Sequence, residues 1–206
     1  NVYPLVVVND NFDQAMRIIL QSAVIGPISP NLVLFGWPQK SERLEAFGEH
    51  LRNVAVLKKS MACLIQHEGS SRRSNRIDIW WRGKENGSLM LLLAHLIRSN
   101  PAWTHTSIRL IRVIEDNEGR TPSLNALRAL GLHARIDVDA ECIVSNDPIA
   151  RVIIQHSSDA RLVIMGFIPP PTPEATASLF DLHTQLHDHL HDTLLVWSNG
   201  DADITA

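Results

Sequence analysis

Four histidines and two aspartates fall within ten residues near the end of this sequence, at HTQLHDHLHD (183–192). On a helix, His183, His187 and His191 would follow one another at spacings of four, as paired zinc ligands do. Zinc needs three or four ligands in a tetrahedron, with further groups to orient them. The aspartates would point to the other side of the helix, and the HExxH pattern is absent. We therefore predict an amphipathic helix with a histidine flank in contact with water, and no metal site.

The loop GKENGS (83–88) is a second place where chemistry could occur, because it follows a predicted strand and opens a predicted helix. Ligands of open α/β sheets bind at such positions, and Gly87 and Ser88 could offer backbone N–H groups to an anion. The GxxxxGK[ST] order of a P-loop is missing, however. We favour the alternative, a turn glycine followed by a serine that caps the helix.

Two further segments could bind phosphate. LVIMGFIPPP (162–171) is similar to the last segment of nucleotide-binding universal stress proteins, in which a Gly-rich phosphate loop follows the strand. Here Phe167 and prolines occupy the loop, and proline has no N–H to offer. The similarity supports the fold and argues against ATP at this position. The loop SSRRSNR (70–76) holds three arginines, which we expect to be solvated.

Composition excludes several classes of protein. The net charge of −3 and the pI of about 6.4 give no sign of the basic face of a nucleic-acid binder. Cys63 and Cys142 form neither a CxxC pair nor a disulfide framework. There is no GxSxG elbow, and no apolar run is long enough to span a bilayer. We expect a non-enzymatic globular fragment of a longer protein, without a cofactor.

Strand-like apolar runs alternate with helical patterns, and these elements must position the residues above. The predicted strands are YPLVVV, PNLVLFGW, RIDIWW, SIRLIRVI, ARIDVDAECIV, RLVIMGF and TLLVWS, and the predicted helices cover 11–25, 41–66 in two pieces, 87–99, 123–132, 147–157 and 174–192. In the last helix, leucines at 179, 182, 186 and 190 form a stripe that faces the sheet.

The order of these elements predicts the fold class. Runs such as LVLF and LVIM are apolar on both faces, as in a parallel sheet covered by helices. We predict an α/β doubly wound fold, with a mostly parallel sheet and helices on both faces, like that of universal stress proteins. No sequence repeat of fixed period is found. Residues 1–206 form one domain in this prediction, with two subdomains, 1–70 and 71–206, as the alternative.

Several segments in order resemble the cytosolic C-terminal domain of the cation-chloride cotransporters. The likeness begins at PNLVLFGWP (30–38) and continues through 77–113, where that family has an Ile-Asp strand with aromatic residues, a Gly-containing turn, a Leu-rich helix, a Trp and a Ser-Ile-Arg strand. It resumes at SSDARLVIMGFIPPP (157–171) and ends with TLLVWSNGDADIT (193–205).

The resemblance implies a regulatory and dimerisation domain of a membrane symporter of chloride with potassium or sodium, at the cytoplasmic face of the cell membrane. Its partners would be a second copy and the transmembrane domain of its own chain, and not nucleic acid. Residues 143–160 leave no room for the phosphorylatable insertion of animal members, which favours a prokaryotic member. The basic, Gly-containing segment that contributes to nucleotide binding in the family is missing before YPLVVV. A stand-alone nucleotide-binding module like a universal stress protein is the alternative, and a small enzyme is a third possibility.

For the contact with a second copy, we nominate the helix of 174–192, its histidine flank and the final strand. The late position of that strand suggests a place near a sheet edge, and exposed edges invite pairing. The histidines would make the contact sensitive to pH near their ordinary pKa of about 6.5. A monomer whose last helix covers the sheet is the alternative.

Overall fold

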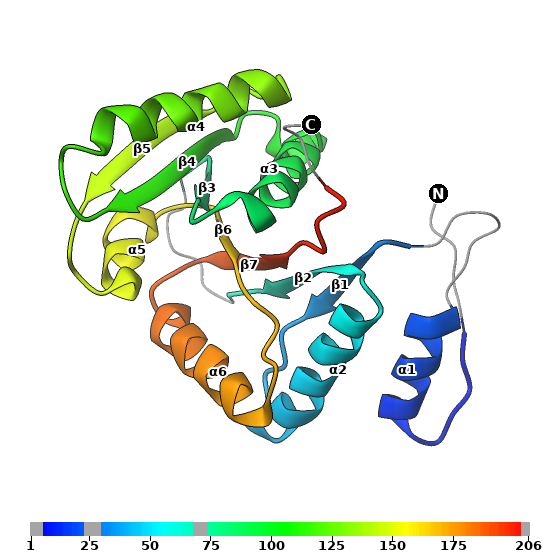
Figure 1. Cartoon of the computed structure of the whole chain (residues 1–206). Coiled ribbons are helices and arrows are strands. Elements are labelled where there is room, and N and C mark those ends of the chain that lie inside the picture. Colours follow the sequence, from blue (N-terminus) through cyan, green and yellow to red (C-terminus); the bar gives the residue numbers. More distant parts are fainter. Residues whose placement is uncertain (1–5, 23–29, 68–73, 203–206) are drawn as a thin grey trace.

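The computed structural model describes residues 6–22, 30–67 and 74–202, without the side chains at 41, 84, 182, 183 and 187 (Figure 1). The strands in this part of the chain are β1 (Leu32–Gly36), β2 (Ser60–Ile65), β3 (Arg76–Trp80), β4 (Ser107–Ile114), β5 (Asp139–Val144), β6 (Leu162–Gly166) and β7 (Asp192–Trp197). The helices are α1 (Phe12–Ser22), α2 (Leu44–Val56), α3 (Lys84–Arg98), α4 (Arg120–Ala134), α5 (Ile149–Ser157) and α6 (Pro173–His187), with short 3₁₀ turns η1 (Ser41–Arg43) and η2 (Pro101–Trp103).

All of these strands join one sheet, in the order β1-β2-β7-β6-β3-β4-β5. Neighbouring strands are parallel except for β2 and β7, which are antiparallel. The predicted α/β fold with a mostly parallel sheet is confirmed. Strands from both sides of residue 70 lie in the same sheet, and the proposed division into 1–70 and 71–206 stays a prediction.

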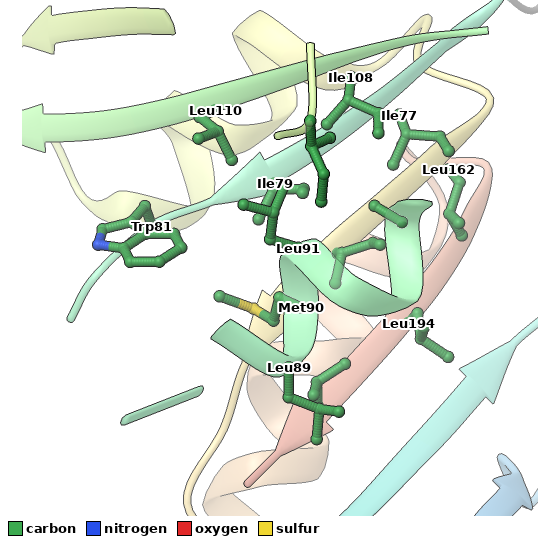
Figure 2. Close-up of a cluster of buried hydrophobic side chains, with 14 of the residues drawn as sticks. Ile77, Ile79, Trp81, Leu89, Met90, Leu91, Ile108, Leu110, Leu162 and Leu194 are labelled. Atoms are coloured by element: carbon green, nitrogen blue, oxygen red, sulfur yellow. The ribbon is translucent and has the colours of Figure 1, made fainter. Parts of the chain in front are cut away.

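Helices cover both faces of the sheet because alternate strand residues point to opposite sides. On one face, called the α3 face, α3 and α4 bury Ile77 and Ile79 of β3 together with Leu162 of β6 (Figure 2). On the other, called the α6 face, α2, α5 and α6 cover the sheet, α1 packs against α2 (Figure 1), and Trp80 and Val163 are buried there. Each strand therefore contributes to two cores, which explains the long apolar runs in the sequence.

Aromatic side chains hold the helices of the α6 face together. The ring of Phe47 on α2 lies 6.2 Å from that of Phe180 on α6, and Trp37, just after β1, contacts both rings. Gly48 of α2 lies so close to Thr176 of α6 that a Cβ on the glycine would overlap the threonine side chain. The small residue is what allows the two helices to approach.

A local two-fold relation connects β1-α2-β2 with β6-α6-β7. Its axis passes between β2 and β7, where Cys63 lies opposite Leu195 in the antiparallel register. Equivalent hydrogen bonds follow the first strand of each unit: Trp37 N–H donates to Leu64 at 2.8 Å and Phe167 N–H donates to Val196 at 3.0 Å. The sequences LVLFGW (32–37) and LVIMGF (162–167) are correspondingly alike. The chain thus contains two similar strand–helix–strand units that sequence analysis did not identify.

Three predictions about elements were wrong. Residues 60–65, expected to be helical, form β2, because a short apolar run buried on both sides does not distinguish helix from strand. Of the predicted strand YPLVVV, residues 3–5 lie outside the described residues, and 6–8 are not a strand. The final strand, expected near an edge, is β7 in the interior of the sheet, and the outermost strands are β1 and β5.

Candidate functional site

The carboxyl edge of the sheet is where an α/β protein of this kind would hold a ligand. The loop after β3 leads to α3, which already begins at Lys84. Gly87 and Ser88 therefore lie inside the helix, where their N–H groups are part of its hydrogen-bonded body. Both interpretations from sequence, an anion site and a turn glycine with a serine cap, were wrong about where the helix begins.

Gly87 serves packing at this edge. A Cβ at that position would overlap the indole ring of Trp81, which lies directly against the glycine. Trp81 is buried, and its N–H donates to the carbonyl of Ile111 on β4 at 2.7 Å. The space between the end of β3 and the first turns of α3 is therefore occupied by this ring.

The side chain of Asn86 connects α3 to the segments that follow β6 and β7. Its side-chain amide donates to the carbonyl of Phe167 at 2.9 Å, and its carbonyl oxygen accepts from the N–H of Ser198 at 2.8 Å. Phe167 is itself buried, and a Cβ on Gly166 would come within 2.9 Å of the Asn86 side chain. The polar groups of the edge are thus engaged with one another across α3 and the ends of β6 and β7.

The histidine cluster does not have the predicted geometry. Helix α6 ends at His187 and a turn follows, so His191 is not one helical turn beyond His187. His191 is buried, and its ring lies 6.3 Å from that of His67, so it does not belong to a flank in contact with water. The side chains of His183 and His187 lie outside the described residues. Within the described part, no group of three His, Cys, Asp or Glu residues is placed to hold a metal ion.

Buried leucines lie on both sides of the point where α6 ends. Leu186 and Leu190 are both buried in the core beneath α5, but the predicted helical stripe was wrong to include Leu190, because α6 ends at His187. The chain reaches Leu190 through a turn, after which β7 begins at Asp192. The Asp192 carboxylate accepts from the N–H of His67 at 3.2 Å. This aspartate therefore joins β7 to the segment after β2.

The most polar buried position is one that sequence analysis did not single out. Asp78 lies in the middle of β3 with no exposed surface, between Ile77 and Ile79, on the α6 face. Arg109 of β4, its direct neighbour in the sheet, donates to both carboxylate oxygens, at 3.0 and 2.6 Å. The hydroxyl of Ser157 on α5 donates to the same carboxylate at 2.7 Å.

A wider network surrounds this pair. Arg76 donates to Asp78 at 2.8 Å and to Asp159 at 2.6 Å, while Arg109 also contacts Glu141 of β5 at 2.7 Å. Burial disfavours the charge of Arg76, but its hydrogen bonds to Asp78 and Asp159 outweigh burial and raise the pKa of the guanidinium. One of the three arginines of the loop 70–76 is thus an ion-pair partner and not a solvated charge. The other two lie outside the described residues.

The arrangement around Asp78 favours a structural role for this residue over a catalytic one. Both carboxylate oxygens are hydrogen-bonded, and removing one member of such a buried pair is costly because the other charge stays behind. The network connects β3, β4, β5 and α5. One signal in the sequence could have indicated it: an aspartate flanked by isoleucines in a strand must find partners when it is buried.

The remaining candidates are also structural. Cys63 and Cys142 are free and buried, and burial raises the pKa of the Cys63 thiol to about 12. Trp80 donates its indole N–H to Ser157 at 3.1 Å. Trp103 lies under the guanidinium of Arg161, 3.7 Å from the ring centre. These tryptophans pack within the fold, as expected.

Comparison with known proteins gives two kinds of match. No protein-family model matches the chain. The potassium/chloride cotransporter 3 of Caenorhabditis elegans is 31% identical over 117 residues, which are 52% of this chain and 11% of that protein. The structure of the cytoplasmic domain of a prokaryotic cation chloride cotransporter matches with a TM-score of 0.69 at 21% identity, over 93% of this chain and 71% of that one. The resemblance to the cytosolic domain of the cation-chloride cotransporters is confirmed.

The fold of this chain is also similar to that of a second group of proteins. A universal stress protein from Archaeoglobus fulgidus matches with a TM-score of 0.57 at 14% identity, over 84% of this chain and 62% of that one. The predicted likeness to universal stress proteins is therefore confirmed at the level of the fold. The chain spans about a tenth of the length of its nematode relative. None of the helices in the described part of the chain has the length and apolarity that crossing a bilayer requires.

Proposed function

We propose that this chain is the cytosolic regulatory and dimerisation domain of a membrane cation-chloride cotransporter, and that it carries out no catalysis. The observation that supports this most strongly is the 31% identity to a potassium/chloride cotransporter over about half of the chain. The likeness in fold to a cotransporter's cytoplasmic domain agrees with it. In the whole protein, chloride would move together with potassium or sodium through a separate membrane domain, and this domain would lie at its cytoplasmic face.

The site geometry favours a scaffold over a nucleotide-binding module. The carboxyl edge is filled by Trp81 against Gly87, and Asn86 uses its polar atoms to hold neighbouring loops. The buried carboxylate of Asp78 is fully engaged by Arg76, Arg109 and Ser157. Polar groups that are engaged within the fold support a structural role over ligand binding.

Two experiments test this proposal: sequencing of the reading frame upstream of Asn1, and transport measurements on the whole protein. The reading frame upstream of Asn1 should encode roughly twelve apolar segments of about twenty residues. Expressed whole, the protein should take up a potassium analogue such as rubidium in a chloride-dependent way. The same protein without residues 1–206 should reach the membrane with altered uptake. A frame without apolar segments, or uptake that is unchanged by the deletion, would contradict the proposal.

Self-association is the second part of the proposal. A domain tethered to a dimeric membrane protein needs little affinity of its own, because tethering raises the effective concentration of its partner. We expect a weak, concentration-dependent dimer of the isolated domain, with two-fold symmetry. Sedimentation over a range of concentrations, at about pH 5.5 and about pH 7.5, tests both the dimer and any part that histidines play. A monomer at every concentration would contradict this part.

A further inference from the structure

Two helices on opposite faces of the sheet, α4 and α6, differ in charge. Helix α4 on the α3 face contains Arg120 and Arg128 and no acidic residue, and Arg135 follows directly as its C-cap. Helix α6 on the opposite face contains Glu174 and Asp181 and no lysine or arginine. A chain with a net charge of −3 therefore presents a basic helix on one side.

The outer side of α4 combines this charge with an exposed leucine. Thr121, Asn125, Arg128 and Leu132 recur at spacings of four and three, which places them along one side of the helix, and Arg135 follows the helix as its C-cap in the left-handed conformation. The inner side is committed to the core through Leu127 and Gly131. Leu132 is 79% exposed, with Arg128 and Arg135 on either side of it in the sequence. We call these five residues the α4 stripe.

The arginines of this helix are not used within the fold. Arg120, Arg128 and Arg135 form no ion pair with any other described residue, in contrast to Arg76 and Arg109. Within α4 there is no acidic residue, and the nearest ones in the sequence are Asp116 and Glu118 before the helix and Asp137 and Asp139 after it. Exposed guanidinium groups beside an apolar side chain match an anionic lipid surface, which offers phosphate oxygens above an apolar layer.

We infer that the α4 stripe docks onto the anionic surface of a lipid bilayer. Each basic residue near such a surface contributes on the order of 1 kcal/mol, so two or three arginines give only weak binding. Weak binding is sufficient for a domain that its own chain holds near the membrane. The inference rests on the proposed function for that tether, but the contact itself is a property of α4. In this orientation the acidic α6 faces away from the lipid.

Vesicle binding tests the inference on the isolated domain. The probe is large unilamellar vesicles with about 30% phosphatidylserine in phosphatidylcholine, at low salt, where screening is weak. We expect sedimentation of the domain with these vesicles, little with pure phosphatidylcholine, and release as the salt is raised. Changing Arg128→Gln together with Arg135→Gln should lower the partition coefficient by about tenfold or more.

The matched control removes the same charge elsewhere. Arg43→Gln with Arg151→Gln changes two exposed arginines associated with the α6 face and should lower binding by less than about twofold. Equal losses in the two double variants would overturn the inference, as would equal binding to neutral vesicles. Arginine changes that alter self-association while leaving vesicle binding intact would assign the stripe to a protein partner instead. Failure here leaves the cotransporter proposal standing, because that proposal is tested by the reading frame and by transport.

Discussion

The first half of β3, up to its central residue Asp78, forms buried ion pairs, whereas the residue just beyond its carboxyl end contributes an indole ring to apolar packing. Asp78 and Arg76 form ion pairs that involve β4 and the segment before β6. Trp81, the residue that follows β3, packs against the backbone of Gly87. The comparison shows that the edge where related folds place ligands is closed by apolar packing, while the strongest polar interactions lie where no ligand would reach them.

The largest loss of stability should come from breaking the buried ion pair of Asp78. Changing Asp78→Asn keeps the shape of the side chain but leaves Arg109, whose side chain is 16% exposed, without its main counter-charge. We expect the free energy of unfolding to fall by about 3–5 kcal/mol, the usual cost of breaking a buried pair. Urea denaturation measures this loss.

Asp159 provides the control for this prediction. It pairs with the same Arg76 at 2.6 Å, but its side chain is 57% exposed. Asp159→Asn should therefore cost less than about 1 kcal/mol. Equal losses of unfolding free energy for the two variants would mean that burial does not determine how much each ion pair contributes to stability.

The stability of the fold should be the next most sensitive to changes where Trp81 packs against Gly87. Gly87→Ala places a methyl group on the Trp81 ring, which must then move. We expect a loss of about 1–3 kcal/mol, typical of overpacking. Gly36→Ala is the matched control, because a Cβ there meets nothing within 4 Å. If thermal unfolding shows both variants to be as stable as the parent, the ring does not lie against Gly87.

A smaller effect is expected at the hydrogen bonds beside that ring. Asn86→Ala leaves the Phe167 carbonyl and the Ser198 N–H without their partner. We expect a loss of about 1–2 kcal/mol and faster amide exchange at Ser198. Asn146→Ala, which removes only an exposed contact of 3.4 Å to Glu115, should change neither quantity appreciably. Unchanged exchange at Ser198 in the Asn86 variant would contradict the proposed bridge.

The smallest effect concerns nucleotide. With the edge filled, ATP at about 1 mM should shift the midpoint of thermal unfolding by less than about 1 °C. A ligand present at a hundred times its dissociation constant would add about 2.7 kcal/mol to stability, which corresponds to a shift of several degrees. Such a shift would show that the edge opens and would favour the nucleotide-binding alternative.

Much of the fold follows from the sequence because each element carries its own pattern. The alternation of apolar runs and helical periods predicted most helices and all of the described strands except β2. It did not resolve residues 60–65, because their burial on both sides comes from neighbours supplied by β1 and β7. The place of β7 in the sheet likewise depends on long-range pairing, which chain order does not reveal.

The polar site was harder to predict for a related reason. Asp78 was quoted only as part of a strand, and its partners Arg109 and Ser157 lie 31 and 79 residues further along. Nothing local distinguishes Arg109 from the solvated arginines. Gly87 was expected in a turn, because glycine is common in turns. In the structure its small size instead makes room for the ring of Trp81, and the sequence does not distinguish these two roles.

The two-fold relation between β1-α2-β2 and β6-α6-β7 has a consequence for association. Two separate molecules that paired strands in this way would lose translational and rotational freedom, at a cost of roughly 4–15 kcal/mol. Here one polypeptide supplies both sides, so the pairing of Cys63 with Leu195 is independent of protein concentration. Dilution cannot separate these units, and both inner strands already have neighbours on each side. The proposed pairing with a second copy would therefore require a surface other than the contact between β2 and β7.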